Sequence, residues 1–495
     1  MSLAFLAVAW TPGPSAAASS FSTGIVDIDS FQSSGTIPFE RAEAAGTKYL
    51  KDNLYWTRVV AGSDSPSQPG TNEIPFDATD PGSPYYDWSI YDRFVRNTVD
   101  YNMVPLLTLT NTPRWAREGC TDSDNCSPKP SDFAAFAEAA AKRYSGSFDP
   151  GDGEGVLPRV RHWQAWVEPN LETYYKPVFK GDGTPSSPNT YRKLLNSFYD
   201  AVHSVRNNNV VLSAGLSPNG LFNLAVSPLE FTRDMLCMTG DYKKPRPKPG
   251  CRARTKADVW AVHPYTSGAP THFPAFPDNM TVAALPRMVK LLRAANRANH
   301  LRGNRSVTPL WVTEFGWDSK GPDPGGVPWN LQTRWVAQAM YKMFRANVNT
   351  MIWFLLRDQN LNEGDRASGR TFESGLYLRG KTMAEDRPKK VLKAFSYPFV
   401  ANRTRDGFNF WGRTPDGSRA DSGRPKIRIL ARKRGGGKFI RVATTRANSN
   451  GIFAGRVKRR GFTAKGAVRS KVVGGPTSVP FGLNKTRDFF QPPFG

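Results

Sequence analysis

Short apolar runs alternate with segments in which apolar residues recur every three or four positions, from about residue 21 to residue 400. The apolar runs are typical of buried strands, and the periodic segments are typical of amphipathic helices. Strands are predicted at residues 23–28, 54–61, 104–109, 160–167, 210–214, 259–263, 310–313 and 350–355. Helices are predicted at residues 39–52, 91–100, 132–144, 189–205, 282–296, 331–346 and 388–395.

This alternation predicts an α/β fold with a parallel sheet and helical crossovers. Eight strand–helix repeats fit a (β/α)8 barrel, the TIM barrel, and we assign residues 19–400 to it. An open doubly wound sheet is the alternative. Such a sheet usually has a glycine-rich turn after its first strand, and this chain has none there.

From about residue 404 the pattern changes to short alternating runs separated by Gly, Pro, Asn and Asp. This predicts a small C-terminal all-β, sandwich-like domain over residues 401–495. The segment holds 22 Lys or Arg against 4 Asp or Glu, so most of the chain's net charge of +25 lies there. The charge is either plain solvated surface or a patch for a polyanion. An anionic cell-envelope polymer or an acidic polysaccharide fits an exported protein better than nucleic acid does.

The N-terminus and the cysteines both favour export. An apolar run at residues 3–10 is followed by small residues at 15–20, which predicts a signal peptide-like leader over residues 1–18. The usual basic start of such a leader is missing. A disordered tail is the alternative. No internal stretch approaches the roughly 20 apolar residues of a membrane span. We therefore expect a protein that is secreted or associated with the cell envelope.

The four cysteines form two local pairs, Cys120 with Cys126 and Cys237 with Cys251, in polar, loop-like sequence. In an exported chain this predicts two loop-closing disulfide bonds. A metal site is the competing interpretation, but five His and no CxxC pair argue against it.

Two apolar runs each stop at one acidic residue: WQAWVEPNL at Glu168 and PLWVTEFGW at Glu314. In a parallel barrel the carboxyl ends of the strands form the mouth that holds the catalytic groups. The two runs are the fourth and seventh predicted strands, on opposite sides of the ring. Two carboxylates about 5 Å apart across a pocket can hydrolyse a glycosidic bond with retention. Salt-bridged loop residues are the alternative.

Four motifs occur in the order found in a known clan. TPRWA follows strand three, VEPN follows strand four, HPY follows strand six and WVTEFGW covers strand seven. The chain therefore resembles the clan A retaining glycoside hydrolases, most closely the xylosidase and iduronidase branch with its appended β-domain. The resemblance implies that Glu168 is the acid/base, that Glu314 is the nucleophile, and that an oligo- or polysaccharide is cleaved without a metal or organic cofactor.

The resemblance also implies five substrate-binding residues. Tyr265 would hydrogen-bond Glu314, and His263 would line the subsite. Arg58 would keep the nucleophile ionised, because a nearby cation lowers the pKa of a carboxylate. Trp353 would be the sugar platform, since an aromatic face suits the apolar side of a pyranose. Trp115, in TPRWA, is the fifth. Both tryptophans could instead be ordinary core residues, His263 a satisfied strand-end histidine, and Arg58 the partner of a surface acid.

One residue departs from the clan's pattern. The clan has Asn directly before the acid/base, where it hydrogen-bonds the sugar 2-hydroxyl; this chain has Val167. Asn170 is not in an equivalent place, because neighbouring strand-end positions point elsewhere. Val167 motivates one alternative to an active glycosidase, a catalytically silent carbohydrate-binding barrel. The positive charge of the tail motivates another, an envelope-associated scaffold that binds polyanions through its tail.

Overall fold

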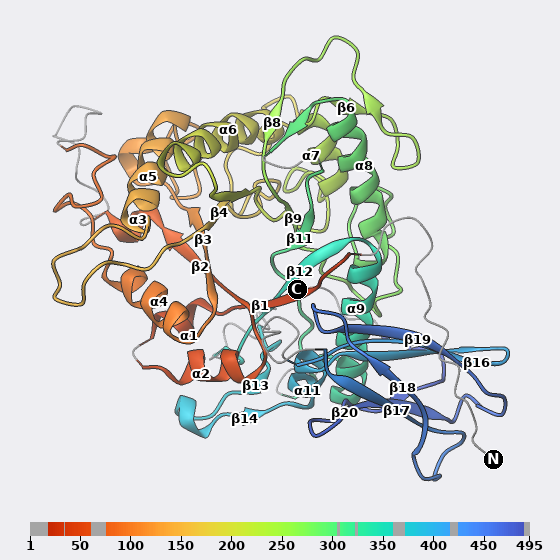
Figure 1. The fold of residues 1–495 in the computed structure, drawn as a ribbon. Coiled ribbons are helices and arrows are strands. Elements are labelled where there is room, and N and C mark those ends of the chain that lie inside the picture. The colour runs from red at the N-terminus through yellow and green to blue at the C-terminus, as the bar shows by residue number, and fades with distance from the viewer. Residues whose placement is uncertain are drawn as a thin grey trace.

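The computed structural model describes residues 18–33, 35–60, 76–303, 307–321, 325–359, 372–415 and 424–489. Apart from Ala18, the expected leader lies outside these residues. Eight parallel strands form one sheet in the order β5-β4-β3-β2-β1-β12-β11-β9 (Figure 1). Parallel bridges Leu212–Val259 and Leu216–Val262 connect the β5 side of this sheet to the β9 side. The ring is thereby closed, and the predicted TIM barrel is confirmed.

Seven of the barrel strands coincide with predicted runs, and β2 lies earlier than the run predicted for it. The barrel strands are β1 (Ser22–Val26), β2 (Tyr49–Tyr55), β3 (Val104–Thr110), β4 (His162–Ala165), β5 (Val210–Leu212), β9 (Trp260–Val262), β11 (Leu310–Val312) and β12 (Val348–Phe354). Three short pairs lie outside the barrel: β6 (Met238–Thr239) with β7 (Arg246–Pro247), β8 (Thr255–Lys256) with β10 (Leu301–Arg302), and β13 (Tyr377–Leu378) with β14 (Arg387–Pro388).

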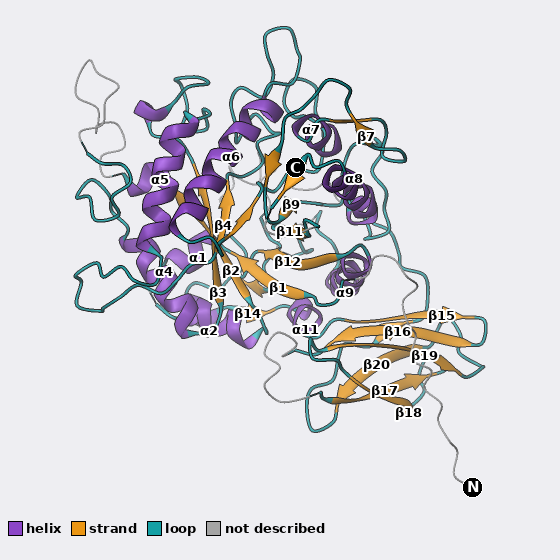
Figure 2. Cartoon of the chain, turned by 45° about the horizontal axis from the view of Figure 1, so that its top comes forward, coloured by secondary structure: helices purple, strands orange, loops and turns teal. Residues whose placement is uncertain are grey.

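Helices surround the barrel and pack their apolar faces against it (Figure 2). They are α1 (Ile28–Gln32), α2 (Ile37–Ala44), α3 (Trp56–Val59), α4 (Ser89–Asp100), α5 (Pro130–Arg143), α6 (Ser187–Val205), α7 (Pro228–Met235), α8 (Leu285–Arg297), α9 (Trp329–Arg345) and α11 (Lys390–Ser396), with 3₁₀ turns η1 (Arg114–Ala116), η2 (Val282–Ala284) and η3 (Met383–Glu385). No described helix is long and apolar enough to span a membrane.

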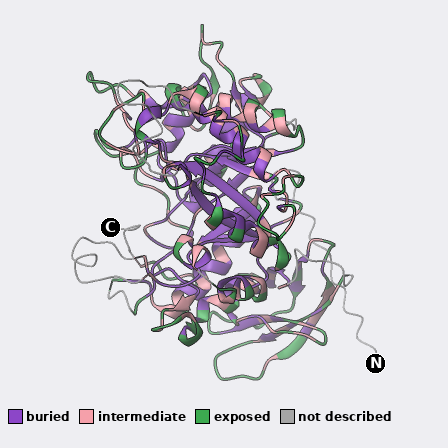
Figure 3. Cartoon of the chain, turned by 90° about the vertical axis from the view of Figure 1, so that its left-hand side faces the viewer, coloured by how far each residue is buried: buried purple, intermediate pink, exposed green. Residues whose placement is uncertain are grey.

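The barrel strands are largely buried (Figure 3). The inside of the barrel has an apolar cluster of its own, the interior layer, separate from the larger cluster that includes the helices. It consists of Val26, Tyr49, Leu106, Leu212, Val259, Trp311 and Ile352. Side chains alternate along a strand, so residues two positions further on face the same interior, closer to the carboxyl-end mouth.

The second strand lies earlier in the chain than predicted. β2 covers Tyr49–Tyr55, whereas the sequence predicts a strand at residues 54–61. The helix predicted at residues 39–52 is also too long, because α2 covers Ile37–Ala44. The strand sequence YLKDNLY has three polar residues in its middle, a pattern that suggests a helix end. In the structure Lys51 and Asp52 are nonetheless completely buried. The local sequence does not reveal this, because the hydrogen-bond partners of these side chains lie on distant parts of the chain. This shift changes which cation reaches the barrel interior.

The tail forms two antiparallel sheets beside α9 and α11 (Figures 1 and 2). One contains β15 (Phe399–Thr404), β16 (Gly407–Arg413) and β19 (Ile452–Lys458). The other contains β18 (Ile440–Arg446), β17 (Lys426–Arg432), β20 (Ala467–Val472) and β21 (Phe481–Gly482). Trp411 of the first sheet packs against Tyr341 and Phe344 of α9. The predicted all-β C-terminal region is therefore confirmed.

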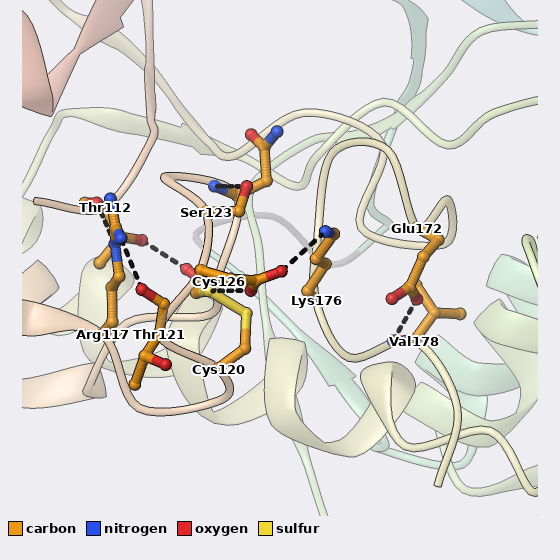
Figure 4. The surroundings of a disulfide bond; sticks show 11 residues. Thr112, Arg117, Cys120, Thr121, Ser123, Cys126, Glu172, Lys176 and Val178 are labelled. Atoms are coloured by element: carbon orange, nitrogen blue, oxygen red, sulfur yellow. Dashed lines mark hydrogen bonds and ion pairs between the residues drawn. A yellow bond between two sulfur atoms is a disulfide. The ribbon is translucent and has the colours of Figure 1, made fainter. Parts of the chain in front are cut away.

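Both predicted disulfide bonds are present, Cys120–Cys126 and Cys237–Cys251. The first closes a turn in the loop after β3 (Figure 4). This loop is joined to the loop after β4: the Ser127 N–H donates to the Lys176 carbonyl at 2.8 Å, and the Lys176 N–H donates to the Asn125 carbonyl at 2.9 Å. The disulfide therefore stiffens two loops that follow neighbouring barrel strands.

Candidate active site

Glu168 and Glu314 both lie just past the carboxyl ends of barrel strands, Glu168 after β4 and Glu314 after β11. Their side chains are 11% and 14% exposed. Glu168 has a φ of 41°, a left-handed conformation that is costly for a residue other than glycine and is common at functional sites. Its N–H donates to the Gly215 carbonyl at 2.9 Å, which fixes this turn against the segment after β5.

His263, which follows β9, lies between the two carboxylates. Its Nδ1 is 2.8 Å from Glu168 Oε1 and 3.8 Å from Glu314 Oε2. Glu168 Oε1 and Glu314 Oε2 can therefore be no further apart than the sum of these two distances. They are closer than that sum wherever the two oxygens and Nδ1 do not lie on one line. Carboxyl groups of retaining glycosidases are about 5–5.5 Å apart, and those of inverting enzymes about 6.5–9.5 Å. The His263 side chain contacts the two carboxylates. Because it is completely buried, it does not line an open subsite.

The position of the His263 ring depends on a small residue and a hydroxyl. A Cβ on Gly215 would come within 1.9 Å of His263 Nε2, so only glycine leaves room for the ring. His263 Nε2 also lies 3.1 Å from Thr313 Oγ1, within hydrogen-bond distance. The Gln164 side-chain amide donates to Thr313 Oγ1 at 3.2 Å and accepts from Thr108 Oγ1 at 3.0 Å. A buried hydrogen-bond network in the barrel interior thus orients the imidazole.

Glu314 is surrounded by groups that favour its ionised form. Lys51 Nζ lies 2.6 Å from Oε1, and the Tyr265 hydroxyl donates to Oε2 at 3.3 Å. Burial alone raises the pKa of Glu314, but His263, Lys51 and the Tyr265 hydrogen bond together hold it below its ordinary value. Burial and the charges of Glu314 and Glu168 raise the pKa of Tyr265 well above its ordinary value, so its hydroxyl keeps its proton. Tyr265 thus contacts Glu314 as expected.

The cation beside Glu314 is Lys51, and the expectation for Arg58 is corrected. Arg58 is exposed on α3, where Nη1 donates to Gln32 Oε1 at 2.9 Å and the guanidinium lies 4.7 Å from the centre of the Tyr55 ring. Lys51 is two residues along β2 from Tyr49, a member of the interior apolar layer, so it faces inward. The alternation of Tyr49, Lys51 and Asn53 with buried Leu50 and Leu54 is the signal that could have identified it.

Trp353 is not positioned as a sugar platform. Its side chain is completely buried, packs against Phe315 and Phe395, and donates its indole N–H to the Ser374 carbonyl at 2.9 Å. Ile352 belongs to the interior layer, so Trp353 faces the surrounding helices. Phe354 has the same parity as Ile352 and is half-buried, so it is the aromatic residue on the inner side of this strand end.

Trp115 is 7% exposed on η1, after β3. Its ring packs edge-on against Trp56 with centroids 5.3 Å apart, as a core residue would. Its buried indole N–H has no hydrogen-bond partner among the described residues. Trp115 is therefore mainly a packing residue, and its indole N–H is an unused hydrogen-bond donor among the described residues.

Amide groups near the mouth bear on the departure at Val167, whose side chain is half-buried. Asn170 is fully used: its amide donates to the Ser217 and Val226 carbonyls at 3.1 and 2.9 Å and accepts from the Ser217 N–H at 2.9 Å. It cannot replace the missing amide. Asn53, two residues beyond Lys51 on the same face of β2, is 9% exposed and has a buried Oδ1 without a hydrogen-bond partner among the described residues.

One group of side chains in the described part of the chain has the spacing of metal ligands: Cys120, Asp122 and Cys126. The two cysteines are joined in a disulfide bond, so their sulfurs are not available as thiolate ligands. This group does not fit a metal ion.

No family model and no curated protein sequence matches the chain. Among solved structures, it is similar to a family 39 glycoside hydrolase from the gut symbiont Bacteroides cellulosilyticus WH2, with 16% identity over 88% of this chain and 80% of that chain and a TM-score of 0.49. It is also similar to a GH39 enzyme from Xanthomonas axonopodis pv. citri, with 12% identity over 92% of this chain and 94% of that chain and a TM-score of 0.49. For a GH30 endoxylanase from Clostridium papyrosolvens C71, the identity is 12% over 92% of this chain and 97% of that chain, and the TM-score is 0.45. Similarity this distant does not assign a function.

Proposed function

We propose that the chain is a retaining glycoside hydrolase that uses Glu314 as nucleophile and Glu168 as acid/base. The observation that carries this proposal is the contact of one imidazole, His263, with two largely buried carboxylates at the barrel mouth. The separation that this contact allows is compatible with retention. A buried cation beside only one of the carboxylates gives the two groups different roles.

In the first step Glu314, ionised beside Lys51, attacks the anomeric carbon, and Glu168 gives a proton to the leaving oxygen. The glycosyl–Glu314 ester forms as the bond to the leaving group breaks. Water, deprotonated by Glu168, then cleaves the ester and regenerates both groups. His263 and Tyr265 position the carboxylates: His263 Nδ1 lies 2.8 Å from Glu168 Oε1, and the Tyr265 hydroxyl donates to Glu314.

The test is hydrolysis of aryl pentosides and hexosides of both anomers by wild type, Glu314→Ala, Glu168→Ala and the control Glu172→Gln. Glu172 lies four residues beyond Glu168 and accepts the Val178 N–H at 2.9 Å, so the control changes a nearby carboxylate outside the pair (Figure 4). We expect turnover to fall by at least about 10³-fold in Glu314→Ala and to persist in Glu172→Gln.

Added azide distinguishes the two roles. With Glu314→Ala it should replace the nucleophile and give a glycosyl azide of inverted configuration. With Glu168→Ala it should accept the glycosyl group from Glu314 and give the retained configuration. Unchanged hydrolysis in Glu314→Ala contradicts the assignment.

A second candidate function, a silent carbohydrate-binding barrel, is favoured by Val167, because Asn170 does not supply the missing amide. It predicts oligosaccharide binding by the wild type without turnover on any substrate of the panel. We further propose that the protein is exported, since two disulfide bonds persist in oxidising compartments.

A further inference from the structure

The outer face of the four-stranded tail sheet is strongly basic. On β17, Ile427, Ile429 and Ala431 are completely buried, so the alternate positions point away from the core. The pairing of β17 with β18 and β20 places cations of all three strands on this outer face. They are Lys426, Arg428, Arg432, Arg441, Arg446, Arg469 and Lys471, which we call the basic face.

The described residues of the tail supply little negative charge to the basic face. The sequence has no Asp or Glu between residues 424 and 487. None of the seven side chains forms an ion pair with another described residue. Cross-strand neighbours such as Arg428 and Lys471 place like charges opposite each other, which is unfavourable in an isolated sheet. An external polyanion would relieve this repulsion.

Two of the arginines are held in place before any ligand binds. The Arg432 and Arg469 guanidinium groups lie 5.2 and 4.3 Å from the centre of the Phe439 ring. Their Nε atoms are buried without a hydrogen-bond partner among the described residues. A guanidinium fixed on an aromatic ring loses less conformational entropy on binding, and its planar fork matches a carboxylate or sulfate.

We propose that the basic face binds a linear anionic polysaccharide. The sheet contacts α9 at its β21 edge, through Arg334, and β18 is the opposite edge. In Figure 2, β17 and β18 lie beyond β15 and β16 as seen from α9, so a linear polymer can approach the face from the β18 edge. Cations repeat at about 7 Å along a strand and about 5 Å between strands, which suits a chain of regularly spaced charges. The disulfide bonds favour an oxidising compartment, where polysaccharide is the more accessible polyanion.

Nucleic acid is the less favoured occupant. Proteins that bind single strands stack bases on exposed aromatic rings. In the described part of this sheet no aromatic ring is exposed, because Phe481 is buried and the half-buried Phe439 is covered by the two guanidinium groups. The inference does not depend on the proposed hydrolysis, since the basic face and the barrel mouth belong to different sheets.

The test measures binding of the full-length chain to polygalacturonate, to heparin and to a 20-base-pair DNA duplex at several NaCl concentrations. The variant is Arg428→Glu with Lys471→Glu, which reverses two cross-strand neighbours. The matched control is Lys193→Glu with Arg297→Glu, two exposed cations of α6 and α8, and it changes the net charge equally. Thermal unfolding of each protein checks that the fold is intact.

We expect wild type and control to bind at least one polysaccharide with an affinity that falls steeply with salt. The basic-face variant should bind about tenfold more weakly or worse. Absence of polysaccharide binding by the wild type overturns the proposal, and so does equal weakening in variant and control. Tighter binding of DNA than of either polysaccharide at the same salt concentration overturns the choice of ligand.

Discussion

Replacing Lys51 should shift the acidic limb of the pH–activity profile. Lys51 Nζ is completely buried and 2.6 Å from Glu314 Oε1. An opposite charge at this range lowers a carboxylate pKa by about 1–3 units. The pKa of Glu314 is now below its ordinary value because cations offset the effect of burial. In Lys51→Met the burial effect and the contributions of His263 and Tyr265 remain, but the charge and the hydrogen bond of Lys51 are lost, so the pKa of Glu314 rises.

The nucleophile must be ionised, so the acidic limb of kcat/KM moves to higher pH by about 1–3 units. Each unit corresponds to about a tenfold loss of activity at a fixed pH below the limb. Activity should recover partly at alkaline pH. Lys51→Arg keeps a cation at this position, so its limb should stay near that of the wild type.

The assay is kcat/KM between pH 4 and 9 for wild type, Lys51→Met, Lys51→Arg and Arg58→Met. Arg58 is the matched control, because it is an exposed cation bound to Gln32 and near the same strand end. Its removal should leave the acidic limb in place. An unmoved limb in Lys51→Met, or an equal shift in Arg58→Met, would refute the assignment of Lys51 as the cation that keeps Glu314 ionised.

Three further predictions concern positioning, stability and specificity. Gly215→Ala puts a methyl group where His263 Nε2 lies, so kcat should fall by about 10²-fold while the melting temperature shows whether the fold persists. Replacing both Cys237 and Cys251 by Ala opens a loop with a sequence separation of 14 and should cost about 3 kcal/mol in urea unfolding. Val167→Asn should raise kcat/KM about tenfold on glycosides with a 2-hydroxyl; an equal gain on 2-deoxy glycosides would exclude the intended hydrogen bond.

Much of the fold could be predicted because burial leaves a local pattern. Most of the barrel strands lie in short, largely apolar runs, as strands covered on both faces usually do. The order of strand and helix then limits the topology to very few choices. The cysteine pairs could be predicted for a similar reason, since the two cysteines of each pair are close together in the sequence. Glu168 and Glu314 were identifiable because each stands where an apolar run ends.

The contacts between side chains could not be predicted in the same way. Lys51 is in a strand that carries three consecutive polar residues, and its partner Glu314 is 263 positions away. Trp353 and Phe354 are neighbours in sequence, and only the register of β12 decides which of them faces the interior. A shift of one position exchanges the two faces of a strand.

The sequence alone determined the alternation of elements, the all-β tail, its positive charge and two acidic strand ends, because each depends on residues close together in the chain. The tertiary structure decided which cation reaches Glu314, where His263 sits between the carboxylates, and that seven cations of three strands share one face. These arrangements depend on strand pairing and side-chain direction, which are fixed only when distant segments pack together.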